Sequence, residues 1–559
     1  MDNLLIITTS HDIAVAETVA ARLEQYRVVF FDPTLVDPIA ASALRNAEFV
    51  AWNACPDYPA LVAAAHADAH AFEAALDAEL RELLPEASLA GWQHLNLFYF
   101  FLGHRWYNGL WKDVLGKLRE HKPHVFLCDN PSTYYWPSFV PALLLLQLLR
   151  TMEIPFSAVK YGARPEEADV VINFGESEAG PYDVLSHLPT CFYDAAHFSA
   201  ELQASGKTNL HIEPKYWGVP FEATAKTNLM RLHHQQALSG GAPPLAALAE
   251  RLEARLDALL APYIATPEYR ARQARQLSTL YQCQVVDLHA LERHFHTHKP
   301  GKLLLSDHDA GFHGPLLSFA ARHRIPVLMV PHAKTSEDIE FDYGDVTMLT
   351  HPMQGLPLFN SRRQRLRHQT LPYVENFGAS SAPPGPLKTV GLLLNGISLN
   401  GIMCTEFSVY LAGIARIAAW CAEHGITLRI RCRQAQSLIE IIERACGADA
   451  DAMRACLVGS LSQFAQSIDL CLMYDAPTNA DIEFLRTAVP ILNPIPAPLS
   501  KAEAATADSR IVPRASVEAT LAQLDDFRDD ANNLHIFAMA QFADYVSLFK
   551  QTCALRRLL

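Results

Sequence analysis

The chain has 559 residues, which is more than one hydrophobic core usually supports, so we expect at least two domains. Hydrophobic residues make up 50% and charged residues 19%, a globular composition that excludes a largely disordered or fibrous protein. The formal net charge of −14 matches a phosphate polymer poorly. We therefore expect no nucleic-acid partner.

The cysteines and the apolar segments indicate a cytoplasmic protein. Eleven cysteines are scattered between Cys55 and Cys553 without a C-x-x-C pair, which is typical of reduced thiols rather than of a disulfide framework or a zinc site. Residues 1–10 contain no basic residue and only a short apolar run, unlike a signal peptide. The most apolar stretch, 142–149, is too short to span a bilayer. Peripheral association with the inner face of the cytoplasmic membrane stays open.

The N-terminal half alternates between predicted strands and helices. A strand at 4–8, a helix and a second strand at 28–31 form a βαβ beginning. Residues 58–121 or so read as a helical insertion rich in aromatic side chains, which pack on a sheet or, alternatively, face an acceptor or a lipid. The segments 121–155 and 298–330 each read as strand, loop, helix and strand, so we predict a parallel sheet.

A domain boundary is predicted where prolines and small residues form an extended linker, ASSAPPGP at 379–386. We assign 1–378 to an N-terminal Rossmann-like domain that carries the helical insertion, and 387–559 to a C-terminal Rossmann-like domain that ends in helices. Alternating strands and helices predict the parallel sheet of the second domain. Its predicted strands are 389–394, 426–431, 455–458, 470–474 and 489–492.

Three segments of the C-terminal half carry a family resemblance. The sequence ENFG at 375–378 looks like the turn that enters the hinge, and Asn395 and Gly396 form a tight polar turn after the first strand. Residues 470–493 contain a strand, a turn with threonine, a helix with glutamate and a proline-led strand. These segments resemble the donor domain of bacterial surface-polysaccharide (capsule and lipopolysaccharide type) GT-B glycosyltransferases. The resemblance implies an α/β fold of two Rossmann-like domains that face each other across a cleft, with Asn395 and Gly396 at the donor.

The turn and helix of this last segment are predicted to bind the donor. Thr478 and Asn479 lie where a helix begins, and the unpaired N–H groups and helix dipole there favour a phosphate. Glu483 lies one turn further and can accept hydrogen bonds from a ribose diol. The alternatives are a simple helix cap for Thr478 and Asn479 and an ion pair with Arg486 for Glu483.

A basic strand precedes this segment. Arg431 and Arg433 lie at the end of this strand, with one residue between them. Guanidinium groups at this position can hold a diphosphate or a monophosphate. The alternative is that both arginines belong to a solvated surface.

The candidate catalytic residues are in the N-terminal half, after two apolar strands. Asp307 and Asp309 stand in the sequence SDHDAGFHG, and His332 and Lys334 stand in the sequence PHAKT. Sugar transfer requires a base for the acceptor hydroxyl, or a carboxylate nucleophile, and cations at the leaving phosphate. His332 is a candidate base or donor ligand, the aspartates are candidate bases or nucleophiles, and Lys334 is a candidate phosphate ligand. The alternatives are a structural histidine and, for Asp309, a helix cap.

Together with these residues, the resemblance implies a glycosyltransferase that moves a sugar from a nucleotide-sugar donor to a surface glycan or a protein acceptor. Nucleotide sugar is the substrate, and neither a cofactor nor a metal is expected. His294, His296 and His298 read as a solvated helix end, since no cysteine or carboxylate is evidently placed to complete a metal site. The alternatives are a sugar-nucleotide epimerase of the same architecture and a GT-B-like scaffold without catalysis.

Overall fold

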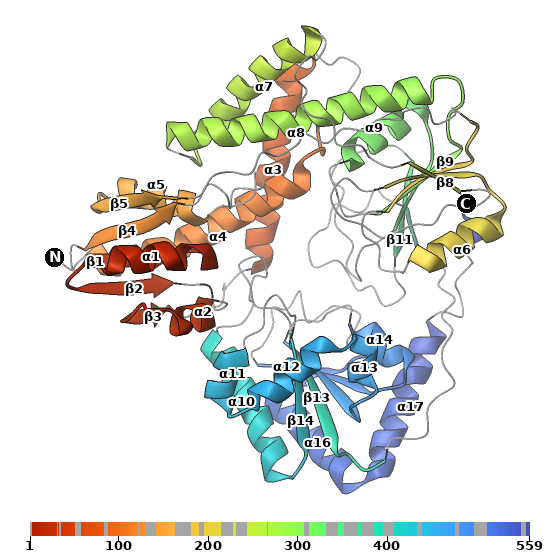
Figure 1. Cartoon of the computed structure of the whole chain (residues 1–559). Coiled ribbons are helices and arrows are strands. Elements are labelled where there is room, and N and C mark those ends of the chain that lie inside the picture. The colour runs from red at the N-terminus through yellow and green to blue at the C-terminus, as the bar shows by residue number, and fades with distance from the viewer. Residues whose placement is uncertain are drawn as a thin grey trace.

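The chain folds into three parallel β-sheets flanked by helices, which confirms the predicted α/β class. The three sheets surround the middle of the molecule (Figure 1). We call them the N-terminal, central and C-terminal sheets. The computed structural model describes residues 3–30, 32, 35–50, 58–82, 88–119, 123–129, 141–161, 180–188, 195–213, 227–230, 243–264, 266–306, 312–330, 345–350, 367–370, 385–394, 407–432, 439–475, 480–496, 511–548 and 555–559.

The N-terminal sheet has the strand order β3-β2-β1-β4-β5. Apolar side chains of β1 are buried on both faces, as expected for a parallel strand covered by helices on each side. Helices α1 and α2 pack on one face, and α5 with the second half of α4 packs on the other. The bounds are β1 (Asn3–Ile7), η1 (Ser10–Asp12), α1 (Ile13–Ala20), β2 (Tyr26–Phe30), α2 (Val36–Ala41), β3 (Ala47–Phe49), α4 (His94–Arg119), β4 (His124–Asp129), α5 (Pro141–Thr151) and β5 (Phe156–Lys160).

The central sheet has the order β12-β11-β10-β9-β6-β7-β8. Apolar residues of α8 and α9 share a core with one face of this sheet, and α6 packs on the other face. The bounds are β6 (Val184–His187), α6 (Ala195–Ser205), β7 (Asn209–Ile212), β8 (Thr227–Met230), α8 (Pro267–His294), β9 (Lys302–Ser306), α9 (His313–His323), β10 (Val327–Val330), β11 (Val346–Thr350) and β12 (Arg367–Thr370).

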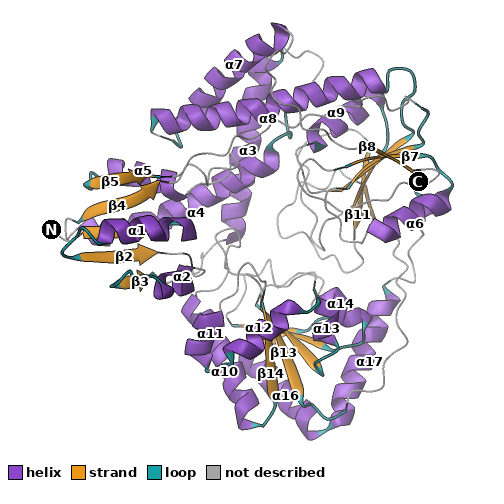
Figure 2. Ribbon diagram, in the orientation of Figure 1, coloured by secondary structure: helices purple, strands orange, loops and turns teal. Residues whose placement is uncertain are grey.

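The helical insertion connects these two sheets. It contains α3 (Tyr58–Leu80) and α4, which pack with α7 (Pro243–Leu260) and α8. Figure 2 shows α8 running across the top of the molecule from the side of the N-terminal sheet to the central sheet. The predicted packing role of the aromatic residues is confirmed, because Trp92, Phe101 and Trp111 are at most 2% exposed.

The C-terminal sheet has the order β14-β13-β15-β16-β17. Helices α10, α11 and α16 cover one face, whereas α13, α14 and α17 cover the other. Contacts between α2 and α11 join its core to that of the N-terminal sheet. The bounds are β13 (Thr389–Leu394), α10 (Phe407–Glu423), β14 (Thr427–Arg431), α11 (Ile439–Cys446), α12 (Ala450–Val458), α13 (Leu461–Ala465), β15 (Leu470–Tyr474), α14 (Asp481–Arg486), β16 (Ile491–Ile495), β17 (Arg514–Ser516), α16 (Val517–Asp529) and α17 (Ala531–Ser547).

Two features differ from the sequence-based expectations. The range 1–378 contains two separate sheets, and the similar segments 121–155 and 298–330 contribute to different ones. The predicted strand at 455–458 is wrong, because these residues end α12. The Asp449 side chain caps that helix by accepting hydrogen bonds from the backbone N–H groups of Asp451 and Ala452.

The last residues of the chain return to the central sheet. The short helix η7 (Leu555–Arg557) packs beside α6, where Figure 1 shows the C-terminus. Leu555 is 1% exposed and belongs to the same core as Leu304 and Leu328 of the sheet. The chain end therefore fastens a segment that follows the C-terminal sheet to the N-terminal half.

Candidate functional site

In each of the three sheets, the chain adds strands first on one side of the sheet's earliest strand and then on its other side. We call the place where the direction changes the strand reversal. The reversal lies between β1 and β4, between β6 and β9, and between β13 and β15. In open parallel sheets, ligands bind at the carboxyl ends of the strands at such a reversal. The three carboxyl edges are therefore the first places to look for a site.

In the central sheet, the predicted catalytic segments begin at one edge. Strands β9 and β10 are parallel neighbours, and their last residues, Ser306 and Val330, are paired in register. Asp307 follows the first strand directly, and His332 follows the second by one further residue. The last described residues before the two segments, Ser306 and Val330, therefore lie side by side. Asp307, Asp309, His332 and Lys334 themselves lie outside the described residues.

A histidine that the sequence analysis did not single out ends β6 at the same reversal. His187 is 1% exposed, and its ring lies edge-on to Phe312, which precedes α9. Its Nδ1 lies 3.0 Å from the carbonyl oxygen of Ile212. A carbonyl only accepts hydrogen bonds, so Nδ1 carries a proton. In the neutral ring Nε2 then carries the lone pair, as required of a base.

A second buried histidine supports this edge from β7. Nδ1 of His211 lies 2.9 Å from Oγ of Ser186. Burial, with a smaller contribution from His187, lowers the pKa of His211 to about 3. His211 is therefore neutral near pH 7. Neither β6 nor β7 was predicted from the sequence, so these two histidines were not recognised as residues of a sheet edge.

At the carboxyl edge of the N-terminal sheet, the carboxylate of Asp12 is engaged in hydrogen bonds within the fold. Oδ2 of the buried Asp12 accepts hydrogen bonds from the backbone N–H groups of Thr8 and Thr9, at 2.8 Å each. Its Oδ1 accepts one from the Tyr161 hydroxyl at 2.6 Å. These bonds use the carboxylate to fix the turn after β1, so it serves the fold.

In the C-terminal sheet, the reversal carries a left-handed residue. Asp475 follows β15 with φ of 65° and is 6% exposed. Its N–H donates to the carbonyl of Pro494 at 3.0 Å, and its carbonyl accepts from the Asn493 side chain at 2.9 Å. Non-glycine residues rarely adopt this conformation, and strained turns of this kind gather at functional sites. The predicted phosphate-binding residues Thr478 and Asn479 come next in the chain and lie outside the described residues.

Glu483 lies in α14, where it makes the ion pair named as the alternative. Its Oε2 lies 3.3 Å from the Arg486 guanidinium, and both side chains are partly exposed. An ion pair of this kind contributes little to stability. Its carboxylate is thus available at small cost to a ligand hydroxyl.

Arg431 ends β14, which is separated from β15 by β13. Its guanidinium donates to the carbonyl of Cys456 in the last turn of α12 and lies over the Phe464 ring, 5.8 Å from the centroid. A cation at this position satisfies a helix-end carbonyl. Arg431 therefore lies on the edge strand of the sheet, whereas Glu483 lies in the helix that follows β15. Arg433, Asn395 and Gly396 lie outside the described residues.

Two further observations concern the described part of the chain alone. No three of its histidine, cysteine, aspartate and glutamate side chains are grouped to hold a metal ion. Among its helices, none is both long enough and apolar enough to cross a membrane.

The chain matches no protein-family model, and no curated protein matches its sequence. It is similar to several solved structures. MurG of Acinetobacter baumannii is 11% identical with a TM-score of 0.34, over 67% of this chain and 98% of MurG. The glycosyltransferase SnogD of Streptomyces nogalater is 13% identical with a TM-score of 0.34, over 67% of this chain and 96% of SnogD. The glycosyltransferase VinC, solved with dTDP, is 13% identical with a TM-score of 0.33, over 65% of this chain and 95% of VinC. TM-scores of this size do not establish a common fold.

Proposed function

We propose that the protein is a metal-independent GT-B-type glycosyltransferase that moves a sugar from a nucleotide-sugar donor to a surface glycan or a protein acceptor. The observation that carries the proposal is the pairing of Ser306 with Val330, which starts the acidic segment and the His-Lys segment at the same edge of the central sheet. That edge coincides with a reversal of strand order, where parallel sheets bind ligands. The sequence resemblance to surface-polysaccharide enzymes supports the choice of acceptor.

In this proposal, the acceptor hydroxyl gives its proton to His332 or to an aspartate of the 307–309 segment. Lys334 stabilises negative charge on the leaving phosphate, and Thr478 with Asn479 holds the donor phosphate at the C-terminal sheet. His187 ends β6 at the same edge as the catalytic segments, and we assign it to this site as a third histidine or carboxylate position to be tested. The reaction is placed in the cytoplasm, where nucleotide sugars are available to polysaccharide biosynthesis.

The experiment is a thermal-shift screen of the full chain with CMP-, CDP-, UDP-, GDP- and dTDP-linked sugars. A bound donor raises the melting temperature by mass action. The stabilising donor is then supplied with a radiolabelled sugar to polysaccharide and protein fractions of a cell extract. Label in either fraction supports transfer. An isomerised nucleotide sugar without an acceptor identifies an epimerase instead, and binding without any turnover identifies a scaffold.

A further inference from the structure

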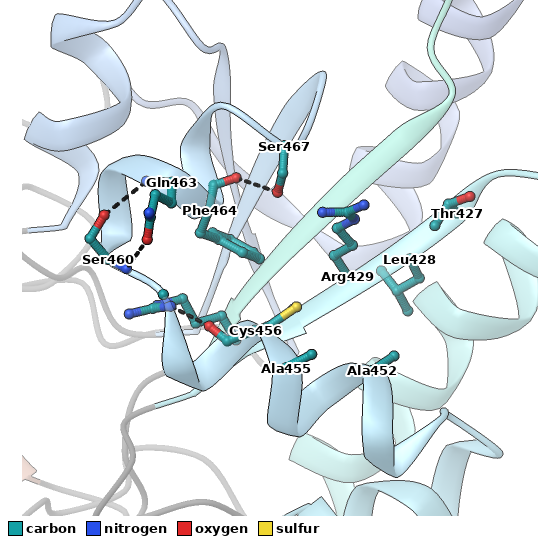
Figure 3. A pocket seen from close by; sticks show the side chains of 12 residues that line it. Thr427, Leu428, Arg429, Ala452, Ala455, Cys456, Ser460, Gln463, Phe464 and Ser467 are labelled. Atoms are coloured by element: carbon teal, nitrogen blue, oxygen red, sulfur yellow. Dashed lines mark hydrogen bonds between the residues drawn. The ribbon is translucent and has the colours of Figure 1, made fainter.

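A pocket of about 400 Å³ opens beside the edge strand of the C-terminal sheet. Strand β14 forms its floor, and helices α12 and α13 form its walls (Figure 3). A volume of this size lies within the usual range of small-molecule sites. The pocket runs along the edge strand β14, whereas the strand reversal of this sheet lies between β13 and β15.

The pocket presents positive charge and no acid. Thr427, Arg429 and Arg431 alternate along β14 and therefore share one face of the strand. None of the twelve residues that line the pocket is acidic, in a chain with 60 acidic and 46 basic residues. A local excess of two guanidinium groups attracts an anion.

The side chains of Arg429 and Arg431 differ in their contacts with the protein. Arg431 is fixed by the Cys456 carbonyl and by the Phe464 ring, and its planar guanidinium has N–H donors beyond the one that this carbonyl uses. Arg429 is exposed, and no acidic side chain among the described residues pairs with it. Figure 3 shows Arg429 extending from β14 toward the space beside Phe464. One anchored and one available cation are thus placed on the same face of β14, at the floor of the pocket.

The apolar wall is built into the sheet. Gly391 of β13 is paired in register with Arg429. A Cβ at Gly391 would collide with Cδ1 of Ile468 and would lie 3.1 Å from Cζ of Phe464. The missing side chain therefore lets both Ile468 and the Phe464 ring lie against the sheet. Ala452 and Ala455 of α12 keep the opposite side open.

The rim adds an amide donor. Ser460 and Gln463 form a capping box at the start of α13, in which Oε1 of Gln463 accepts from the Ser460 N–H at 2.8 Å. Gln463 lines the pocket, and its Nε2 group can only donate hydrogen bonds.

We infer that this pocket binds the phosphate group of a small phosphomonoester, with the rest of the ligand against Phe464 and the alanines of α12. A phosphomonoester carries up to two negative charges and three peripheral oxygens, which match two guanidinium groups better than a carboxylate does. A sugar phosphate and a nucleoside monophosphate share this chemistry. The inference is independent of the proposed transferase activity.

The test is isothermal titration calorimetry of the full chain with glucose 6-phosphate and with UMP, beside inorganic phosphate, glucose and uridine. We expect a Kd below about 1 mM for at least one ester and no measurable heat with glucose or uridine. The ester that binds more tightly identifies the sugar or the nucleotide source. Raising the salt concentration should weaken binding.

Variants locate the binding. Arg429→Ala should weaken it about tenfold, because it removes a charged hydrogen-bond donor from the phosphate. Ala455→Leu should weaken it as well by occupying the pocket from an exposed helix position. Arg454→Ala removes the same charge from α12 outside the pocket and should leave binding within about twofold.

Three results would overturn the inference. The first is that neither ester binds, in which case the arginines only shield an edge strand. The second is that Arg429→Ala has no effect, or an effect equal to that of Arg454→Ala. The third is that inorganic phosphate binds as tightly as both esters, which would leave the apolar wall without a role. Circular dichroism and melting of each variant show that it is folded.

Discussion

The indole of Trp92 packs directly on Gly314, where a Cβ would lie 2.6 Å from the indole Cγ. Nε1 of Trp92 also donates a hydrogen bond to Oγ of Ser318, one turn further along α9, at 2.8 Å. Trp92 precedes α4, so this contact fixes the helical insertion to the helix that follows β9. The insertion therefore helps to position the edge of the central sheet where the catalytic segments begin.

We expect Gly314→Ala to lower the melting temperature, because the new methyl group displaces the indole at a cost of about 1–3 kcal/mol. The matched control is Gly109→Ala on α4, where a Cβ meets no atom within 4 Å. That change should be neutral or stabilising by up to about 1 kcal/mol through helix propensity. Differential scanning fluorimetry checks both variants. Equal effects of the two substitutions would contradict the contact.

Stability should fall in acid because of His211. Its pKa is about 3 when folded, against an ordinary 6.5, so between these values the unfolded chain binds a proton that the folded chain does not. The contribution of neutral His211 to the free energy of unfolding is therefore complete above pH 6.5. It is lost as the pH falls toward 3, by at most about 1.4 kcal/mol per pH unit. Denaturant unfolding at several pH values measures it. His211→Gln should reduce this slope, and an unchanged slope in this variant would contradict the assignment to His211.

Loss of the chain end should destabilise the central sheet. Leu555→Ala removes a side chain that is 1% exposed and should cost about 2–5 kcal/mol. Arg557→Ala, an exposed position in the same short helix, should leave the melting temperature unchanged. If both variants melt like the parent protein, the packing of η7 on the sheet does not hold in solution.

The catalytic assignment predicts a separation of binding from turnover. Asp309→Asn and His332→Ala should keep the donor-induced thermal shift and lose transfer by at least about a hundredfold, since general acid–base groups contribute that much. Thr478→Ala should instead reduce the thermal shift. Unchanged transfer in both of the first two variants would refute their role.

His187→Asn tests the role of the buried histidine at the end of β6, on the carboxyl edge of the central sheet. The asparagine amide can still donate to the Ile212 carbonyl, so the fold should be retained, whereas the ring nitrogen Nε2 is lost. We expect the donor-induced shift to persist and transfer to fall about tenfold or more. The pH profile of transfer should also change in this variant. Parent-like transfer with an unaltered profile would restrict His187 to a packing role.

The sequence predicted the elements whose patterns are local. The strands at 389–394 and 470–474 were placed correctly because each is a continuous apolar run between polar turns. The error at 455–458 has a similar origin, since a short apolar run does not distinguish a strand from a helix. There the Asp449 cap and the alanines of α12 determined the helix.

Contacts between distant segments were decided by the tertiary structure alone. The similar segments 121–155 and 298–330 pair with different strands, because backbone pairing depends on partners that no local pattern names. The same holds for Arg431, whose charge was evident in the sequence, whereas its partners Cys456 and Phe464 come from helices that fold over the strand. Sequence determined which residues are apolar, charged or able to turn, since these are properties of each side chain. Only the folded chain determined which of them meet, because burial and pairing are properties of the whole.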